Sequence, residues 1–150
     1  MSLAKHLEIQ HRALQDFVDL LEREQRLLAE ADVDGQQLLE VADGKRSVLG
    51  EIERLETLRT RAQGKLGYPE GRSGAEQAAR DAGCLAAWQQ LHDTAQRAQT
   101  LNQLNGEVVR MRLEQNQRIL NFLNEAAGKP LYGPNGQSRR HGLGGVSSSA

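Results

Sequence analysis

The stretch "SLAKHLEIQHRALQDFVDLLEREQRLLAEA", residues 2–31, decides the fold class of this chain. Leucines recur in it every seven residues, at Leu7, Leu14, Leu21 and Leu28. A seven-residue spacing places apolar side chains along one face of an α-helix. We therefore predict a first helix over residues 2–31, with Ser2 as its N-cap.

Two clusters of helix-breaking residues divide the rest of the chain. The short acidic "ADVDG" at 31–35 ends the first helix, and the glycine-rich "GKLGYPEGRSG" at 64–74 predicts a longer loop. Between them, a second helix is expected over 36–66, although Lys45 and Arg59 interrupt one of its two apolar rows. The short first link predicts that the first two helices form an antiparallel pair.

A third and longest helix is expected over 75–127, with a start near Cys84 as the alternative. Together the three segments predict an all-α fold, an antiparallel three-helix bundle built from helical hairpins with a long third helix. Hydrophobic residues make up only 38% of the chain, which suits helices that share narrow apolar stripes. We expect a single domain over 1–128, followed by a C-terminal turn and a flexible tail over 129–150.

The apolar pattern of the third helix doubles after Asn105. One stripe continues from the earlier part of the helix through Leu104, Val108, Met111, Ile119 and Phe122. A second stripe lies about 100° around the helix, at Val109, Leu113, Leu120 and Leu123. The first stripe can pack on the other two helices. The second stripe has three possible explanations. The bundle buries more of the helix at this end, the stripe is a partner-binding surface, or it is the contact between copies of the chain in a structural coiled coil.

Five asparagines gather in the same part of the helix, at Asn102, Asn105, Asn116, Asn121 and Asn124. Asparagine is a mediocre helix former, so this density needs a reason. The side chains either bond backbone groups of a partner or set the register of helices inside the bundle. The sequence leaves both explanations open.

No group of residues has the spacing of a catalytic or metal site. His6 and His11 are five residues apart and lie on different helix faces, so they lack zinc-site spacing. The single Cys84 is expected to be a buried apolar residue. The glycine-rich stretch at 64–74 does not match a phosphate-binding loop. We predict no enzyme activity, no metal and no cofactor or small-molecule substrate.

Composition also limits the compartment and the partners. The N-terminus lacks the apolar run of a signal peptide, and no segment reaches the roughly 20 apolar residues that span a bilayer. We therefore expect a cytoplasmic protein. Only 129–150 is basic, with three basic and no acidic residues, which is too little for a nucleic-acid surface.

The segment "NQLNGEVVRMRLEQNQRILNFLNEAAGKPLYGPNGQ", residues 102–137, resembles the C-terminal half of the FlgN family of flagellar export chaperones. The resemblance rests on an N-x-x-N-G start, apolar residues at helical spacing, a further Asn and a closing Y-G-P-x-G. The first 80 residues match the family only loosely.

This resemblance implies a non-enzymatic cytoplasmic chaperone of the flagellar type III export system. Its clients would be the hook–filament junction proteins, whose amphipathic C-terminal segments it shields from premature assembly and delivers to the export apparatus. The membrane would be involved only through the export gate. The implied partner-binding residues are Asn102, Asn105, Gly106, Val109, Leu113, Asn116, Leu120, Leu123, Leu131, Tyr132, Gly133, Pro134 and Gly136.

The closing "LYGPNGQ", residues 131–137, has the composition of a β-turn. Pro134 suits the second position of the turn, Asn135 the third and Gly136 the fourth. Such a turn would swing Leu131 and Tyr132 to one side, where they either cover the end of the bundle or border the client site.

Overall fold

A computed structural model of the protein describes residues 2–128. It contains four helices, α1 (Leu3–Leu28), α2 (Gly35–Lys65), α3 (Arg72–Asp81) and α4 (Leu85–Ala126). All regular secondary structure within residues 2–128 is helical, so the prediction of an all-α fold is confirmed.

The first two helices begin at side-chain caps. The Ser2 hydroxyl accepts a hydrogen bond from the backbone N–H of Lys5 at 3.1 Å, which confirms Ser2 as the N-cap of α1. At α2, Asp34 Oδ1 accepts from the backbone N–H of Gln37 at 3.1 Å. Hydrogen bonds from the side chain and the backbone of Gln37 lower the pKa of the Asp34 carboxyl. Each cap satisfies a backbone donor that the first turn of a helix leaves unpaired.

The predicted third helix over 75–127 is two helices, and the alternative start near Cys84 agrees with the start of α4 at Leu85. Gly83 has a φ of +73° and separates α3 from α4. The N–H of Gly83 donates to Arg80 O at 3.0 Å, and the N–H of Cys84 donates to Ala79 O at 2.8 Å. These two bonds form a Schellman motif, which ends α3 because only glycine adopts the left-handed conformation without strain.

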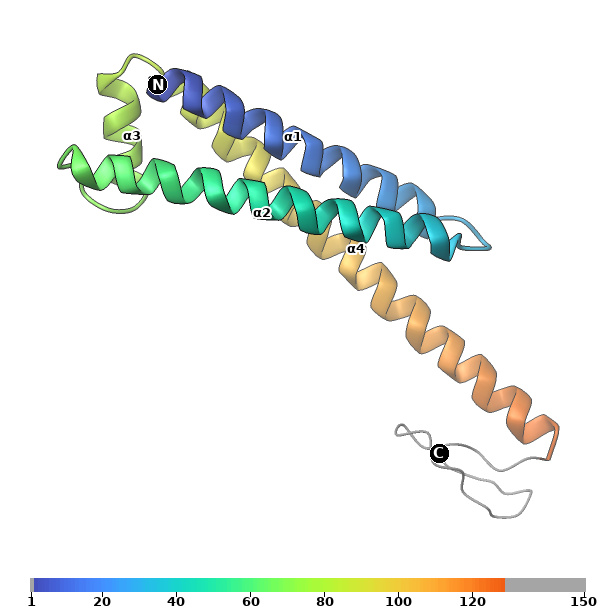
Figure 1. Ribbon diagram of the computed structural model, residues 1–150. Helices are drawn as coiled ribbons and strands as arrows, with labels where there is room; N and C mark the ends of the chain where they lie inside the picture. The colour runs from blue at the N-terminus through green and yellow to red at the C-terminus, as the bar shows by residue number, and fades with distance from the viewer. Residues whose placement is uncertain (1, 129–150) are drawn as a thin grey trace. The chain divides into compact units, whose positions relative to one another are not determined.

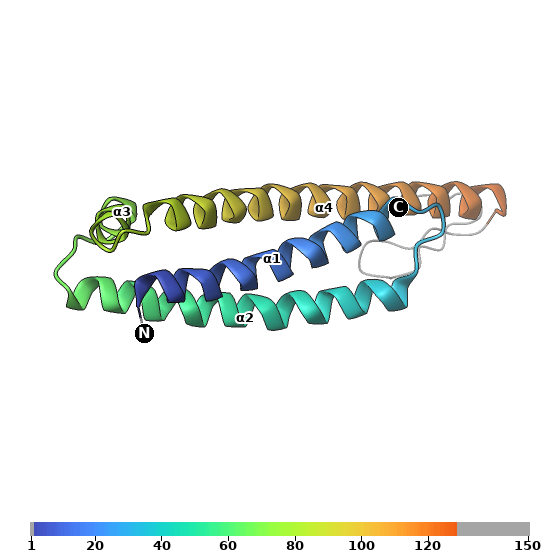
Figure 2. The same ribbon diagram turned by 90° about the horizontal axis from the view of Figure 1, so that it is seen from above.

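The predicted glycine-rich loop lies between α2 and α3. Its close packing requires Gly74, because a Cβ there would lie 1.7 Å from Pro69 O. This contact lets α3 start directly against the loop. In Figure 2 α3 is seen almost end-on, whereas α1 and α2 lie in the plane of the view, so α3 runs across the ends of those helices.

The chain divides into two compact units, Met1–Gly106 and Glu107–Ala150. The long helix α4 contributes to both, since the boundary falls inside it. Whether residues 1–128 form a single domain stays a prediction.

The core of the first unit follows the leucine row that the sequence shows. Leu7, Leu21 and Leu28 are buried, and Leu14 is half-buried against them. One core cluster joins α1, α3 and α4 through Leu7, Ala79, Cys84 and Leu91. A second joins α1 and α4 through Phe17, Val18, Leu21 and Ala98, with Val48 and Ile52 of α2 packed against it. α1 and α2 run antiparallel, as predicted (Figure 1).

Candidate partner-binding surface

The part of α4 that belongs to the second unit has an exposed apolar face. We call this face the α4 apolar surface, and its residues are Val108, Val109, Met111, Leu113, Ile119, Leu120, Phe122 and Leu123. Their exposed fractions range from 38% to 66%. Both predicted stripes are therefore exposed. Earlier in α4, the first stripe packs in the core at Leu91 and Ala98, whereas Leu104 and the later members of the stripe are exposed.

Helical geometry gathers these eight residues on one side of α4. At about 100° per residue they cover an arc of roughly 200°, which also contains Arg112, Gln115 and Asn116. The opposite side carries ion pairs, in which Arg110 bonds Glu107 at 2.7 Å and Glu114 at 2.9 Å. The hydrogen bond to Glu107, and then that to Glu114, raise the pKa of Arg110. These exposed pairs at helical spacing support the helix on its polar side and leave the apolar side uncovered.

Asn105 lies at the end of the first unit and is buried. Its Nδ2 donates to Leu21 O and to Glu24 Oε1, both at 2.9 Å. Glu24 also forms a half-buried ion pair with Lys45, at 3.0 Å, and Lys45 Nζ donates to Asn102 Oδ1 at 2.9 Å. We call these five residues the Asn105 network. The network joins α1, α2 and α4. Asn105 therefore sets the register of helices inside the bundle, which is one of the two roles considered for the asparagines, and it is not assigned to the proposed partner surface.

The other predicted site residues fall into three groups. Asn102 and Asn116 are exposed. A Cβ at Gly106 would meet no atom within 4 Å, and nothing in the structure explains the glycine there. The third group lies outside the described residues: Leu131, Tyr132, Gly133, Pro134 and Gly136.

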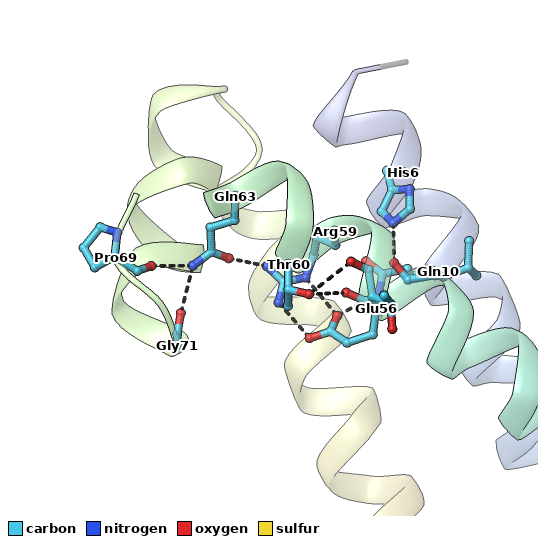
Figure 3. A network of polar contacts seen from close by, with 10 residues as sticks. His6, Gln10, Glu56, Arg59, Thr60, Gln63, Pro69 and Gly71 are labelled. Atoms are coloured by element: carbon cyan, nitrogen blue, oxygen red, sulfur yellow. Dashed lines mark hydrogen bonds and ion pairs between the residues drawn. The ribbon is translucent and has the colours of Figure 1, made fainter. Parts of the chain in front are cut away.

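A second polar network, absent from the sequence analysis, connects α2 to the loop that follows it (Figure 3). Arg59 is buried, and its Nε and Nη2 donate to the Glu56 carboxylate at 2.9 and 2.7 Å. Its Nη1 donates to Gln63 Oε1 at 2.7 Å, and Gln63 Nε2 donates to Pro69 O at 2.6 Å and Gly71 O at 3.3 Å. The interrupted apolar row at Arg59 was the only sequence signal for this network.

The same network reaches the neighbouring helices. Gln10 of α1 donates from Nε2 to Glu56 Oε1 at 3.1 Å, and the Arg59 guanidinium lies 4.9 Å from the ring centre of Trp88 in α4. Partial burial raises the pKa of Glu56, but the hydrogen bonds from Arg59 and Gln10 outweigh it, so the net shift is downward. Glu56 is therefore ionised at neutral pH and compensates the buried Arg59 charge.

The titratable residues considered for chemistry make structural contacts. His6 Nε2 donates to Leu55 O at 2.9 Å, and His11 Nε2 lies 3.0 Å from Thr94 Oγ1. Cys84 is a buried free thiol, and burial raises its pKa. Within residues 2–128, no group of His, Cys, Asp and Glu side chains could hold a metal ion. No described helix combines the length and the apolarity that a membrane crossing requires.

The fold and the exposed face define a class, that of all-α proteins whose longest helix carries an uncovered apolar face. Comparison with known proteins then identifies the family. The family model described as FlgN protein matches residues 1–140, so the chain belongs to the FlgN family.

Three similar proteins each bear the name Flagella synthesis protein FlgN. The proteins of Escherichia coli (strain K12) and Salmonella typhimurium (strain LT2) are each 28% identical over 136 residues, covering 91% of this chain and 89% of theirs. The protein of Proteus mirabilis is 28% identical over 143 residues, covering 95% and 94%. No solved structure matches this chain.

Proposed function

We propose that this protein is a cytoplasmic flagellar export chaperone, without enzymatic activity, that binds the amphipathic C-terminal segments of hook–filament junction proteins. It holds these clients unassembled and delivers them to the type III export apparatus. The observation that carries the proposal is the α4 apolar surface, which exposes eight large apolar side chains within one stretch of helix. Membership of a family whose relatives are named for flagella synthesis supports the flagellar context.

An amphipathic helix is the partner that this surface fits best. A straight helix with a broad apolar arc buries that arc most completely against the apolar face of another helix. Asn116 lies within the arc by helical geometry and is exposed, so its amide is available to fix the register of the client. The tail residues Leu131 and Tyr132 remain part of the proposed site as a border to it.

The energetics favour binding of moderate strength. Full burial of a large apolar side chain contributes about 1.5–3 kcal/mol. The eight side chains start about half exposed, so covering them contributes on the order of 1 kcal/mol each. Association itself costs roughly 4–15 kcal/mol, a range that includes the roughly 8 kcal/mol from the eight side chains, so this surface alone does not hold a client tightly. Such an affinity suits a client that must be released at the export apparatus.

The test is calorimetric binding of a purified client C-terminal segment. We expect the double variant Leu113→Asp with Leu120→Asp to weaken binding by at least about tenfold, because two central apolar contacts would bury charges. Leu39→Asp on α2 is the matched control, since Leu39 is 63% exposed and belongs to the first unit rather than to the α4 apolar surface. If both variants are helical by circular dichroism and bind as the parent does, the placement is wrong.

Self-association of the chain is the competing explanation for the exposed face. Analytical ultracentrifugation of the protein without client separates the two. A monomer at micromolar concentration agrees with the chaperone proposal. A tight dimer that the Leu113→Asp with Leu120→Asp variant dissociates would instead assign the surface to a seam between copies.

A further inference from the structure

A cavity of about 230 Å³, partly open to solvent, lies in the first unit and is lined by residues of α1, α2 and α4. Its walls are mainly apolar, and its lining residues are Gln10, Leu14, Ile52, Glu56, Trp88, Leu91, His92 and Ala95. The indole of Trp88 and the imidazole of His92 are stacked, with ring centres 6.4 Å apart. The cavity is larger than the roughly 150 Å³ engineered protein cavity that binds benzene.

Two buried polar atoms on the cavity wall lack hydrogen-bond partners among the described residues. They are Gln10 Oε1 and His92 Nε2. Gln10 is only 6% exposed, and its Nε2 donates to Glu56, so Oε1 must be the free end of the amide. Because buried polar groups are almost always bonded, two such atoms in one cavity indicate a polar occupant.

The surrounding charges determine the chemistry of that occupant. An anion would meet the ionised Glu56 and the carbonyl oxygen of Gln10, which repel it. A cation would find its two possible partners already engaged, because Arg59 pairs with Glu56 and its guanidinium lies over the Trp88 ring. A neutral molecule avoids both costs. It needs a donor for Gln10 Oε1, and an apolar body for the remaining walls.

We propose that this cavity is a binding site for a small neutral molecule that joins an apolar body to one hydrogen-bond donor, as a phenol does. A ring of that size fits the volume and packs against Trp88, Leu91 and Ile52. Its hydroxyl donates to Gln10 Oε1 or bonds His92 Nε2. The site is independent of the α4 apolar surface, so it stands whether or not the proposed client binds.

The experiment titrates the full-length protein with phenol and, separately, with toluene, and follows the fluorescence of Trp88. Trp88 is the only tryptophan in the chain and lies on the wall of this cavity. It also lines a neighbouring pocket formed with Leu3, Leu58 and Ala75, so a cavity-filling variant is needed to assign the signal to this site. We expect saturable binding of phenol. Ala95→Leu fills the cavity and should abolish binding of both probes.

The decisive variant is Gln10→Met, which keeps the side-chain size and removes the amide oxygen. It also removes the Nε2 hydrogen bond to Glu56, an effect that acts on both probes and that toluene therefore controls for. We expect it to weaken phenol binding by about tenfold, the loss of one hydrogen bond, and to change toluene binding by less than about twofold. Thermal unfolding of each variant confirms that it is folded. The proposal is overturned if phenol does not bind the parent, as for a cavity that holds only water, or if Gln10→Met affects the two probes equally.

Discussion

Asn105 provides the most informative stability test, because the structure gives its side chain a buried role. Its amide donates to Leu21 O and to Glu24 Oε1, both at 2.9 Å, while only 3% of the residue is exposed. Asn105→Ala removes both bonds. The variant leaves Glu24 bonded to Lys45 at 3.0 Å, so the buried charge keeps its main partner.

The magnitude follows from the two bonds. A neutral hydrogen bond contributes about 1 kcal/mol, and one to a charged group about 1.5–3 kcal/mol. Alanine recovers roughly 0.5 kcal/mol through its higher helix propensity. We therefore expect Asn105→Ala to lower the free energy of unfolding by roughly 2–3 kcal/mol and the melting temperature by about 10 °C.

The assay is urea unfolding followed by circular dichroism and by Trp88 fluorescence. Asn102→Ala is the matched control, because Asn102 belongs to the same network but is exposed and makes one bond, to Lys45. Asn102→Ala should lower the free energy of unfolding by no more than roughly 0.5 kcal/mol. Equal losses for the two variants, or a loss below about 0.5 kcal/mol for Asn105→Ala, would refute the assignment of Asn105 to the bundle.

Two further predictions concern the first unit. Gly74→Ala should destabilise the fold by more than about 2 kcal/mol, because the new Cβ would lie 1.7 Å from Pro69 O. Gly50→Ala is the control, because a Cβ there meets no atom within 4 Å, and it should stabilise α2 by about 0.5–1 kcal/mol. Thermal unfolding measures both variants, and similar changes in stability for the two would contradict this account of Gly74. The pKa of Glu56 is lowered in the folded state from its ordinary value of 4.5. The ionised carboxylate therefore stabilises the fold at pH values above 4.5, and this stabilisation is lost as the pH falls through the pKa of the folded state. The difference in free energy of unfolding between the parent and Glu56→Gln should therefore be constant from neutral pH down to about 5 and shrink below it, and urea titrations that show no such narrowing would exclude this role for the pairing with Arg59.

Local patterns in the sequence predicted most of the bundle. The leucine row of α1 and the cap at Ser2 depend on neighbouring residues, and both match the structure. The sequence placed an alternative start of the long helix near Cys84, one residue before α4 begins. It did not separate α3 as a helix of its own, because a single glycine in an alanine-rich segment is compatible with a continuous helix until its φ is known.

The remaining features depend on contacts between distant parts of the chain. Asn105 contacts α1 at a separation of 84 residues, and Gln10 contacts Glu56 at 46. No local pattern distinguishes such pairs from solvated side chains. In the same way, the doubled apolar pattern of α4 predicted a second apolar face that another surface must bury, but only the structure shows that both stripes are exposed.

The most direct test of the central claim is amide hydrogen exchange of the full-length protein with and without a client C-terminal segment. If the α4 apolar surface binds the client, exchange slows over residues 107–126 and is unchanged in α1 and α2. Protection confined to α1 and α2, with no change in residues 107–126, would contradict the proposal.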